Sequence, residues 1–148
     1  MPKPSEMTTS QRGLEAGMFR EGFRENAYND VAPNDPDFPA DEKRGTWTFG
    51  YGSTWYYRGG RRVAVKKGDK ITRADAQKLF VEMWREHEGG VARAIKVDLT
   101  QNQFDALSDM CYHYGESCLL GDDGTGTGIS KAINSGNWHL VDKEFTRW

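Results

Sequence analysis

The chain has 148 residues, a net charge of −2 and hydrophobic side chains at 36% of its positions. This length and apolar share suit one domain, or one domain in two closely joined lobes, and they exclude a globally disordered chain. Because acidic and basic residues are nearly balanced in both halves, the sequence has no basic footprint for nucleic acid. No apolar run is long enough for a signal-peptide core or a membrane span. We therefore expect no membrane insertion, and accumulation in the cytoplasm of the producing cell.

The first predicted element is a helix that Thr9 or Ser10 can cap and that runs to about Glu21. Its buried side is expected to carry Leu14, Met18 and Phe19. Gly22 follows and can supply the left-handed residue with which many helices end. The carboxylate of Glu21 is therefore expected where an ordered element stops.

A small antiparallel sheet is predicted next. Its strands are residues 26–30, 46–57 and 62–66, with a hairpin turn near Gly59-Gly60. The loop 31–45 holds three of the five prolines and no periodic pattern, as functional or mobile loops do. Asn34, Asp35 and Asp37 in this loop are candidate calcium ligands, but their spacing fits no EF-hand and favours a solvated acidic turn.

The aromatic residues of these strands have two candidate roles, as core side chains or as platforms on which sugars stack. They are Tyr51, Trp55, Tyr56 and Tyr57. Core packing is the more common role of strand aromatics.

The rest of the chain is predicted to be helical. A long helix begins after Thr72, and Gly89-Gly90 is a candidate site for a kink within it. A capping box at Thr100–Gln103 begins the next helix, which ends at Gly115. A glycine-rich loop at 121–128 lacks the Lys-Ser/Thr of a phosphate-binding P-loop, so we interpret it as a flexible connection.

Two short helices close the sequence, at 129–135 and after Asn137. The apolar side of the last helix is predicted to consist of Trp138, Val141, Phe145 and Trp148.

The cysteines and histidines form no nucleophile or metal motif. Cys111 lies on an apolar helical face and is most simply a buried thiol, with a bridge to Cys118 as the alternative. The three histidines, His87, His113 and His139, are scattered and no His-Glu-x-x-His occurs, which disfavours a zinc amidase or peptidase. We expect no metal and no cofactor.

Two carboxylates and one hydroxyl are the residues that indicate catalysis. Asp30 comes nine positions after Glu21, and Thr48 lies in a glycine-punctuated run of Thr, Trp, Phe and Tyr. A pair of acids suits hydrolysis of a sugar acetal, in which one acid protonates the leaving oxygen and a second polar group handles the water. Each residue alone has an ordinary structural explanation, as a helix end, a turn and a strand threonine, but the three together favour catalysis.

These residues also carry a resemblance. Glu21-Gly-Phe-Arg-x-x-x-Tyr-x-Asp30, followed by Thr48-Phe-Gly-Tyr-Gly52, resembles the phage-type lysozyme family of muramidases and endolysins. Segments 68–76 and 99–107 resemble the same family. The separation of Asp30 and Thr48 is about a dozen residues longer than in the family, so the loop 31–45 is an insertion.

The resemblance implies roles for individual residues. Glu21, Asp30 and Thr48 are implied to be catalytic: Glu21 as the general acid with a raised pKa, Asp30 ionised, and Thr48 holding the attacking water. His113 falls where the family has a sugar-contacting residue, although a structural hydrogen bond at a helix end is an equal alternative. Together with Tyr51, it is a candidate substrate-binding residue.

The implied fold is α+β and lysozyme-like. We expect a small β lobe at about 24–70, with the insertion 31–45, and a helical part at about 9–23 and 72–148. The long helix joins the two lobes, and the active-site cleft is expected between them. The family has further short helices after the equivalent of Trp148, so the last helix is expected either to lack its usual cover or to receive it from a partner chain.

The implied function is cleavage of the glycan of bacterial peptidoglycan by a phage endolysin during host cell lysis. A protein without a signal peptide would reach the cell wall by holin-dependent release or by delivery in the virion. The alternative is a virion-associated structural or wall-binding protein on a lysozyme scaffold, with reduced or no activity. The long insertion and the short C-terminal part motivate this alternative.

Overall fold

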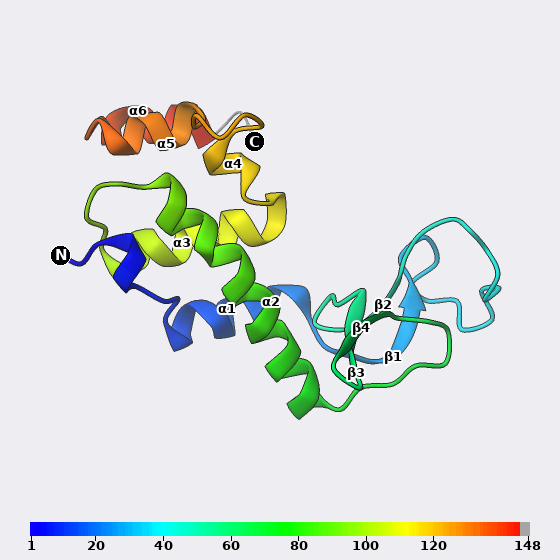
Figure 1. Cartoon of the computed structure of the whole chain (residues 1–148). Coiled ribbons are helices and arrows are strands. Elements are labelled where there is room, and N and C mark those ends of the chain that lie inside the picture. Colours follow the sequence, from blue (N-terminus) through cyan, green and yellow to red (C-terminus); the bar gives the residue numbers. More distant parts are fainter. Residues whose placement is uncertain (146–148) are drawn as a thin grey trace. The chain divides into compact units, whose positions relative to one another are not determined.

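The computed structural model describes residues 1–145, and it describes side chains as far as Val141. The described elements, in chain order, are η1 (Pro4–Glu6), α1 (Gln11–Glu21), β1 (Arg24–Asn29), β2 (Trp47–Gly50), β3 (Trp55–Arg58), β4 (Arg61–Ala64), α2 (Arg73–Ala94), α3 (Gln101–Tyr114), α4 (Ser117–Leu120), α5 (Gly128–Asn134) and α6 (Trp138–Phe145) (Figure 1). Helices and small antiparallel sheets confirm the predicted α+β class.

The chain divides into two compact units. The sheet unit comprises Glu15–Glu82, and the helical unit comprises Met1–Leu14 and Met83–Trp148. The divisions fall inside α1 and inside α2, so each of these helices contributes to both units.

The strands form two separate two-stranded sheets, β1–β2 and β3–β4, so the prediction of a single sheet was wrong. The predicted strand 46–57 is broken because Gly50 and Gly52 adopt left-handed backbone angles, with φ of 62° and 83°. Phe49 and Ser53 then exchange backbone hydrogen bonds of 2.9 Å across a tight turn. This turn separates β2 from β3.

The sheet unit has a small core of mainly aromatic residues. Its buried hydrophobic residues are Phe38, Phe49, Tyr51, Val65, Ala76, Leu79 and Phe80. The ring of Tyr51 contacts those of Phe23 and Phe80 at centroid distances of 5.5 and 5.9 Å. The inserted loop contributes Phe38, which packs edge-on against Trp47 at 6.3 Å. The loop is therefore part of this unit's core.

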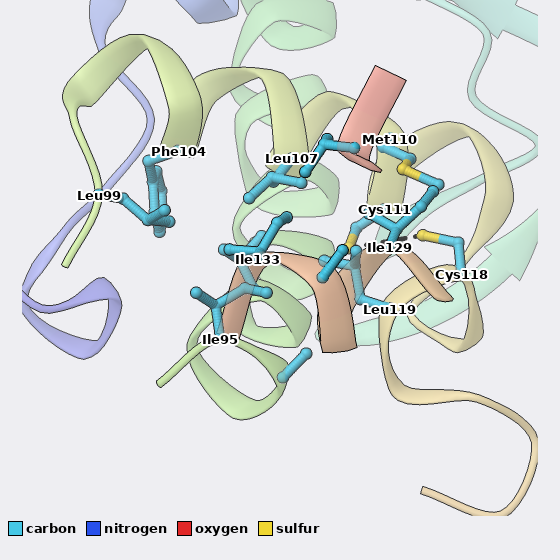
Figure 2. Packing of buried hydrophobic residues seen from close by; sticks show 14 residues of the cluster. Ile95, Leu99, Phe104, Leu107, Met110, Cys111, Cys118, Leu119, Ile129 and Ile133 are labelled. Atoms are coloured by element: carbon cyan, nitrogen blue, oxygen red, sulfur yellow. Dashed lines mark hydrogen bonds between the residues drawn. The ribbon is translucent and has the colours of Figure 1, made fainter. Parts of the chain in front are cut away.

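The helical unit is built around one contiguous apolar cluster from α2, α3, α4, α5 and α6 (Figure 2). Leu99, Phe104 and Ile133 are among its fully buried members. The capping box predicted at the start of α3 is confirmed, since Thr100 and Gln103 exchange side-chain-to-backbone hydrogen bonds of 3.2 and 2.9 Å. The apolar periodicity of these helices therefore forms a core as predicted.

Two details differ from the predictions. Phe19 is 88% exposed, not buried, because it lies on the face of α1 away from Leu14. Helix α2 continues through Gly89-Gly90 without interruption, so the predicted kink is wrong. A Cβ on Gly90 would come within 3.0 Å of Glu116, so close packing explains that glycine.

The cysteines of this unit are both buried and free. The Sγ atoms of Cys111 and Cys118 lie 3.9 Å apart (Figure 2), which confirms a buried thiol and not the alternative disulfide. The hydrogen bond with Cys118, and then burial, raise the pKa of the Cys111 thiol well above its usual range.

On the last helix, Val141 is buried, whereas Trp138 and Leu140 are 39% and 40% exposed. The predicted apolar positions Phe145 and Trp148 fall outside the described side chains. Within the described residues, no helix combines the length and apolar character required to cross a membrane.

Candidate active site

Glu21 is the last residue of α1, as the sequence predicted. Gly22 follows with φ of 70° and donates its N–H to the carbonyl of Met18 at 3.0 Å, which ends the helix. The Glu21 side chain is half-buried and lies against the turn after β2, since a Cβ built on Gly52 would be 3.0 Å from Glu21 Oε2. The helix end and this turn together position the carboxylate.

Asp30 and Thr48 are brought together through the backbone of Thr46. The N–H of Thr46 donates to Asp30 Oδ1 at 2.7 Å, and the Asp30 N–H donates to the Thr46 carbonyl at 3.1 Å. The Thr48 hydroxyl donates to the same carbonyl at 3.2 Å. Tyr28 pairs with Thr48 across the hairpin, so their side chains lie on the same face of the sheet. Asp30 comes two residues after Tyr28, so strand alternation places it on that face as well.

The two groups differ in exposure, and this difference suits different tasks. Asp30 is exposed just beyond the end of β1, whereas Thr48 is only 6% exposed. An exposed carboxylate can attract developing positive charge, whereas a hydroxyl held by a hydrogen bond can orient a water.

Asn29 and Gly45 hold the segment around Asp30, and sequence reasoning assigned neither a role. Asn29 is fully buried, and its side chain donates to the Arg44 carbonyl at 3.1 Å and accepts from the Val31 N–H at 3.0 Å. Gly45 has φ of 73°, and a Cβ there would lie 2.1 Å from Asn29 Oδ1. Together they close the insertion back onto the strand.

Gly52 is a third residue to which sequence reasoning assigned no role. A Cβ at this position would require the Glu21 carboxylate to shift by a few tenths of an ångström, and the φ of 83° would strain any other residue there. The Thr-x-Gly-x-Gly pattern is the sequence signal for it, because glycines in a strand-like run often mark a tight bend or a close approach.

Tyr51 lies mainly in the core. Its ring is 5% exposed, and its hydroxyl accepts a 3.3 Å hydrogen bond from Arg73 Nη1. Of the two roles considered for the strand aromatics, core packing is the one that the structure supports for this ring. Contact of Tyr51 with substrate stays a prediction.

His113 lies near the end of α3 in the helical unit and is the second proposed substrate contact. Its Nδ1 is 3.0 Å from the carbonyl oxygen of Asp109 and 3.1 Å from Asp109 Oδ1. This is the helix-end hydrogen bond that the sequence left as an alternative. The imidazole remains 40% exposed, and its contact with substrate also stays a prediction.

The acidic residues of the inserted loop form a turn. Asp35 Oδ1 accepts the N–H of Asp37 at 2.9 Å, as in a solvated Asx turn. Among the described residues, no group of three or more His, Cys, Asp or Glu side chains is placed to hold a metal ion.

Comparison with known proteins identifies the family. The phage lysozyme family model matches residues 19–148. The endolysin of Bacillus phage B103 is 30% identical over 146 residues, which cover 96% of this chain but 46% of that protein, so this chain spans less than half the length of that relative.

Solved structures agree with this match. An endolysin from Escherichia coli O157:H7 phage FAHEc1 has a TM-score of 0.75 and 31% identity, over 97% of this chain and 77% of that one. A mutant of P22 lysozyme has a TM-score of 0.70 and 25% identity, over 96% and 84%. The chain therefore belongs to the phage lysozyme family, as its sequence motifs predicted.

Proposed function

We propose that this chain is an endolysin-type muramidase, a glycoside hydrolase that cleaves the β-1,4 bond between N-acetylmuramic acid and N-acetylglucosamine in bacterial peptidoglycan. Family membership supports this activity, because similar proteins are endolysins. The observation that carries the proposal is the arrangement of the sheet unit, in which one hairpin holds Asp30 and Thr48 through Thr46 and presents Gly52 to Glu21.

In the proposed reaction, Glu21 donates a proton to the leaving glycosidic oxygen. Asp30, as a carboxylate, stabilises the positive charge that develops at the anomeric carbon. The Thr48 hydroxyl and Asp30 hold a water that attacks the face opposite the leaving group and gives its proton to the Asp30 carboxylate, so the carbon inverts. The hydrogen bond from the Thr48 hydroxyl to the Thr46 carbonyl supports this role, because it leaves the hydroxyl oxygen free to accept from a water.

The test compares wild-type protein with Glu21→Gln in a turbidity assay on bacteria stripped of their outer membrane. The amide cannot supply the proton, so clearing should slow by about 10²- to 10⁴-fold. Glu82→Gln is the matched control, because Glu82 is an exposed glutamate of the same unit, and it should clear like wild type. Circular dichroism should show that all three proteins are folded.

The result that would overturn the proposal is a wild type that clears no faster than Glu21→Gln while still binding cell walls. That outcome would favour the wall-binding or virion structural role. Proton NMR of freshly released products provides a second measurement: inversion predicts the α-anomer first, and a β-anomer would exclude the water mechanism.

Peptidoglycan is the partner that this activity requires. Release through a holin pore, delivery in the virion and a chain covering the last helix stay predictions. Comparison of cell wall lysis by added protein with and without permeabilised membranes tests the need for such delivery.

A further inference from the structure

The inserted loop encloses a groove together with β1. The groove has a volume of about 610 Å³ and lies entirely within the sheet unit. Aromatic side chains of Phe23, Tyr28 and Trp47 line it, and Pro33 and Pro36 of the insertion contribute to the lining. Its volume falls within the roughly 300–1,000 Å³ of typical ligand sites, which are concave and combine mainly apolar and aromatic side chains with a few polar groups.

The loop side of the groove is held in place by specific contacts. Arg24 Nη2 donates to the Pro33 carbonyl, and Lys67 Nζ donates to the Phe38 carbonyl at 2.7 Å. Phe38 itself is 7% exposed and packs against Trp47. The groove is therefore preformed, and a ligand would not have to order the loop on binding.

The charges in the lining narrow the chemistry of the occupant. The cations Arg24 and Lys67 are matched by the anions Glu25 and Asp35. Both cations already donate to loop carbonyls, and Arg24 also stacks over the Tyr28 ring at 4.3 Å. A balanced lining with aromatic faces suits a polar sugar ring with at most one charge better than a peptide with several charges.

The groove adjoins the candidate active site through Tyr28. This residue lines the groove, pairs with Thr48 across the hairpin and lies two positions before Asp30. We propose that β1 and the inserted loop form an additional binding site for N-acetylated sugar units of the glycan strand, next to the cleaved bond. The proposal rests on the proposed muramidase function.

A groove-filling substitution tests the proposal. Asn34 lines the groove and is exposed, so Asn34→Trp places an indole in it. Asp41→Trp is the matched control, because Asp41 is an exposed residue of the same loop outside the lining. Binding is measured by calorimetry in the Glu21→Gln background, with peptide-free oligomers of alternating N-acetylglucosamine and N-acetylmuramic acid, prepared by amidase digestion.

We expect Asn34→Trp to weaken oligomer binding about tenfold, which corresponds to ~1.4 kcal/mol, and Asp41→Trp to leave the affinity within twofold. In the active protein, the same substitution should raise KM for the oligomer with little change in kcat, since the loss affects binding of the ground state and transition state equally.

Two results would overturn the inference. Equal affinity of both variants for the oligomer would show that the groove holds no sugar. A loss seen only with peptide-bearing glycan would assign the groove to the stem peptide.

If the active protein cleaves normally while either result is found, the groove proposal alone fails. If Glu21→Gln clears as fast as wild type but oligomer binding is lost in Asn34→Trp, the proposed catalytic role fails and the groove remains.

Discussion

The sheet unit and the helical unit reach their structures by different means. Among the residues whose side chains are described, the helical unit has one contiguous cluster of 14 buried hydrophobic residues from five helices and the connection between α2 and α3. The sheet unit has a smaller aromatic core, and its buried polar residues Asn29, Thr48 and Ser53 belong to the hairpin or the turn after β2. Apolar packing is therefore the main feature of the helical unit, beside a buried hydrogen-bonded pair of Thr9 and Glu88, whereas hydrogen bonds and glycines determine the geometry of the candidate site.

This difference predicts that substitutions in the helical unit mainly cost stability, whereas those around the hairpin cost activity. The two effects are separable by measuring the free energy of unfolding in urea beside the clearing rate of the same sample. The following substitutions are ordered from the largest expected effect on stability to the smallest.

Phe104→Ala should cost the most stability. Phe104 is 1% exposed in the central cluster, so removing its ring leaves a cavity and should lower the free energy of unfolding by about 3–5 kcal/mol. Urea denaturation measures this loss. Clearing at low temperature, where the variant stays folded, should remain within a few-fold of wild type. A large loss of activity in the folded variant would contradict the separation of the two effects.

Gly45→Ala should affect both properties. The left-handed φ costs an alanine about 1–2 kcal/mol, and its Cβ would meet the side chains of Asn29 and Asp30. Displacement of Asp30 should lower the clearing rate at least tenfold, which corresponds to about 1.4 kcal/mol in the activation free energy. The loss of stability alone would not explain this decrease, because most of the protein would remain folded. Gly59→Ala is the control, because it has a similar φ but no atom within 4 Å of the added Cβ. Equal clearing by both variants would exclude a positioning role for Gly45.

Thr100→Ala should remove half of the capping box of α3. The N–H of Gln103 loses its side-chain acceptor, and the expected cost is about 1 kcal/mol in the free energy of unfolding. Thr100→Ser retains the hydroxyl and should recover most of it. Failure of serine to recover stability would mean that the threonine methyl, not the cap, matters.

Phe19→Ser should have the smallest effect. Because Phe19 is 88% exposed on α1, its loss should change the free energy of unfolding by less than about 0.5 kcal/mol. A larger destabilisation would mean that this face of α1 is covered in solution. Size-exclusion chromatography of wild type and variant would then show whether another copy provides that cover.

The helices were largely predictable from local sequence. Capping at Thr72 and Thr100 and apolar residues at spacings of three and four define α2 and α3, because caps and amphipathic faces are local properties. The short helix Ser117–Leu120 was missed because only Glu116 separates it from Gly115 and it has no side-chain cap. Phe19 was misassigned because the apolar side of a short helix with two glycines is poorly defined by pattern alone.

The sheets were predicted less well. The break between β2 and β3 depends on the angles of Gly50 and Gly52, and a glycine in a strand-like run does not reveal its φ. Asn29 is invisible in the sequence as a site residue, since its importance lies in contacts with Arg44 and Val31 across the folded insertion.

The sequence by itself determined the family, the α+β class, the ends of the main helices and the three candidate catalytic residues, because motif spacing and capping are local along the chain. Only the tertiary structure decided that Thr46 joins Asp30 to Thr48, that Gly52 makes room for Glu21, and that the insertion folds back as one side of a groove. These features are contacts between residues separated along the chain, and such contacts depend on backbone angles and packing that no local pattern specifies.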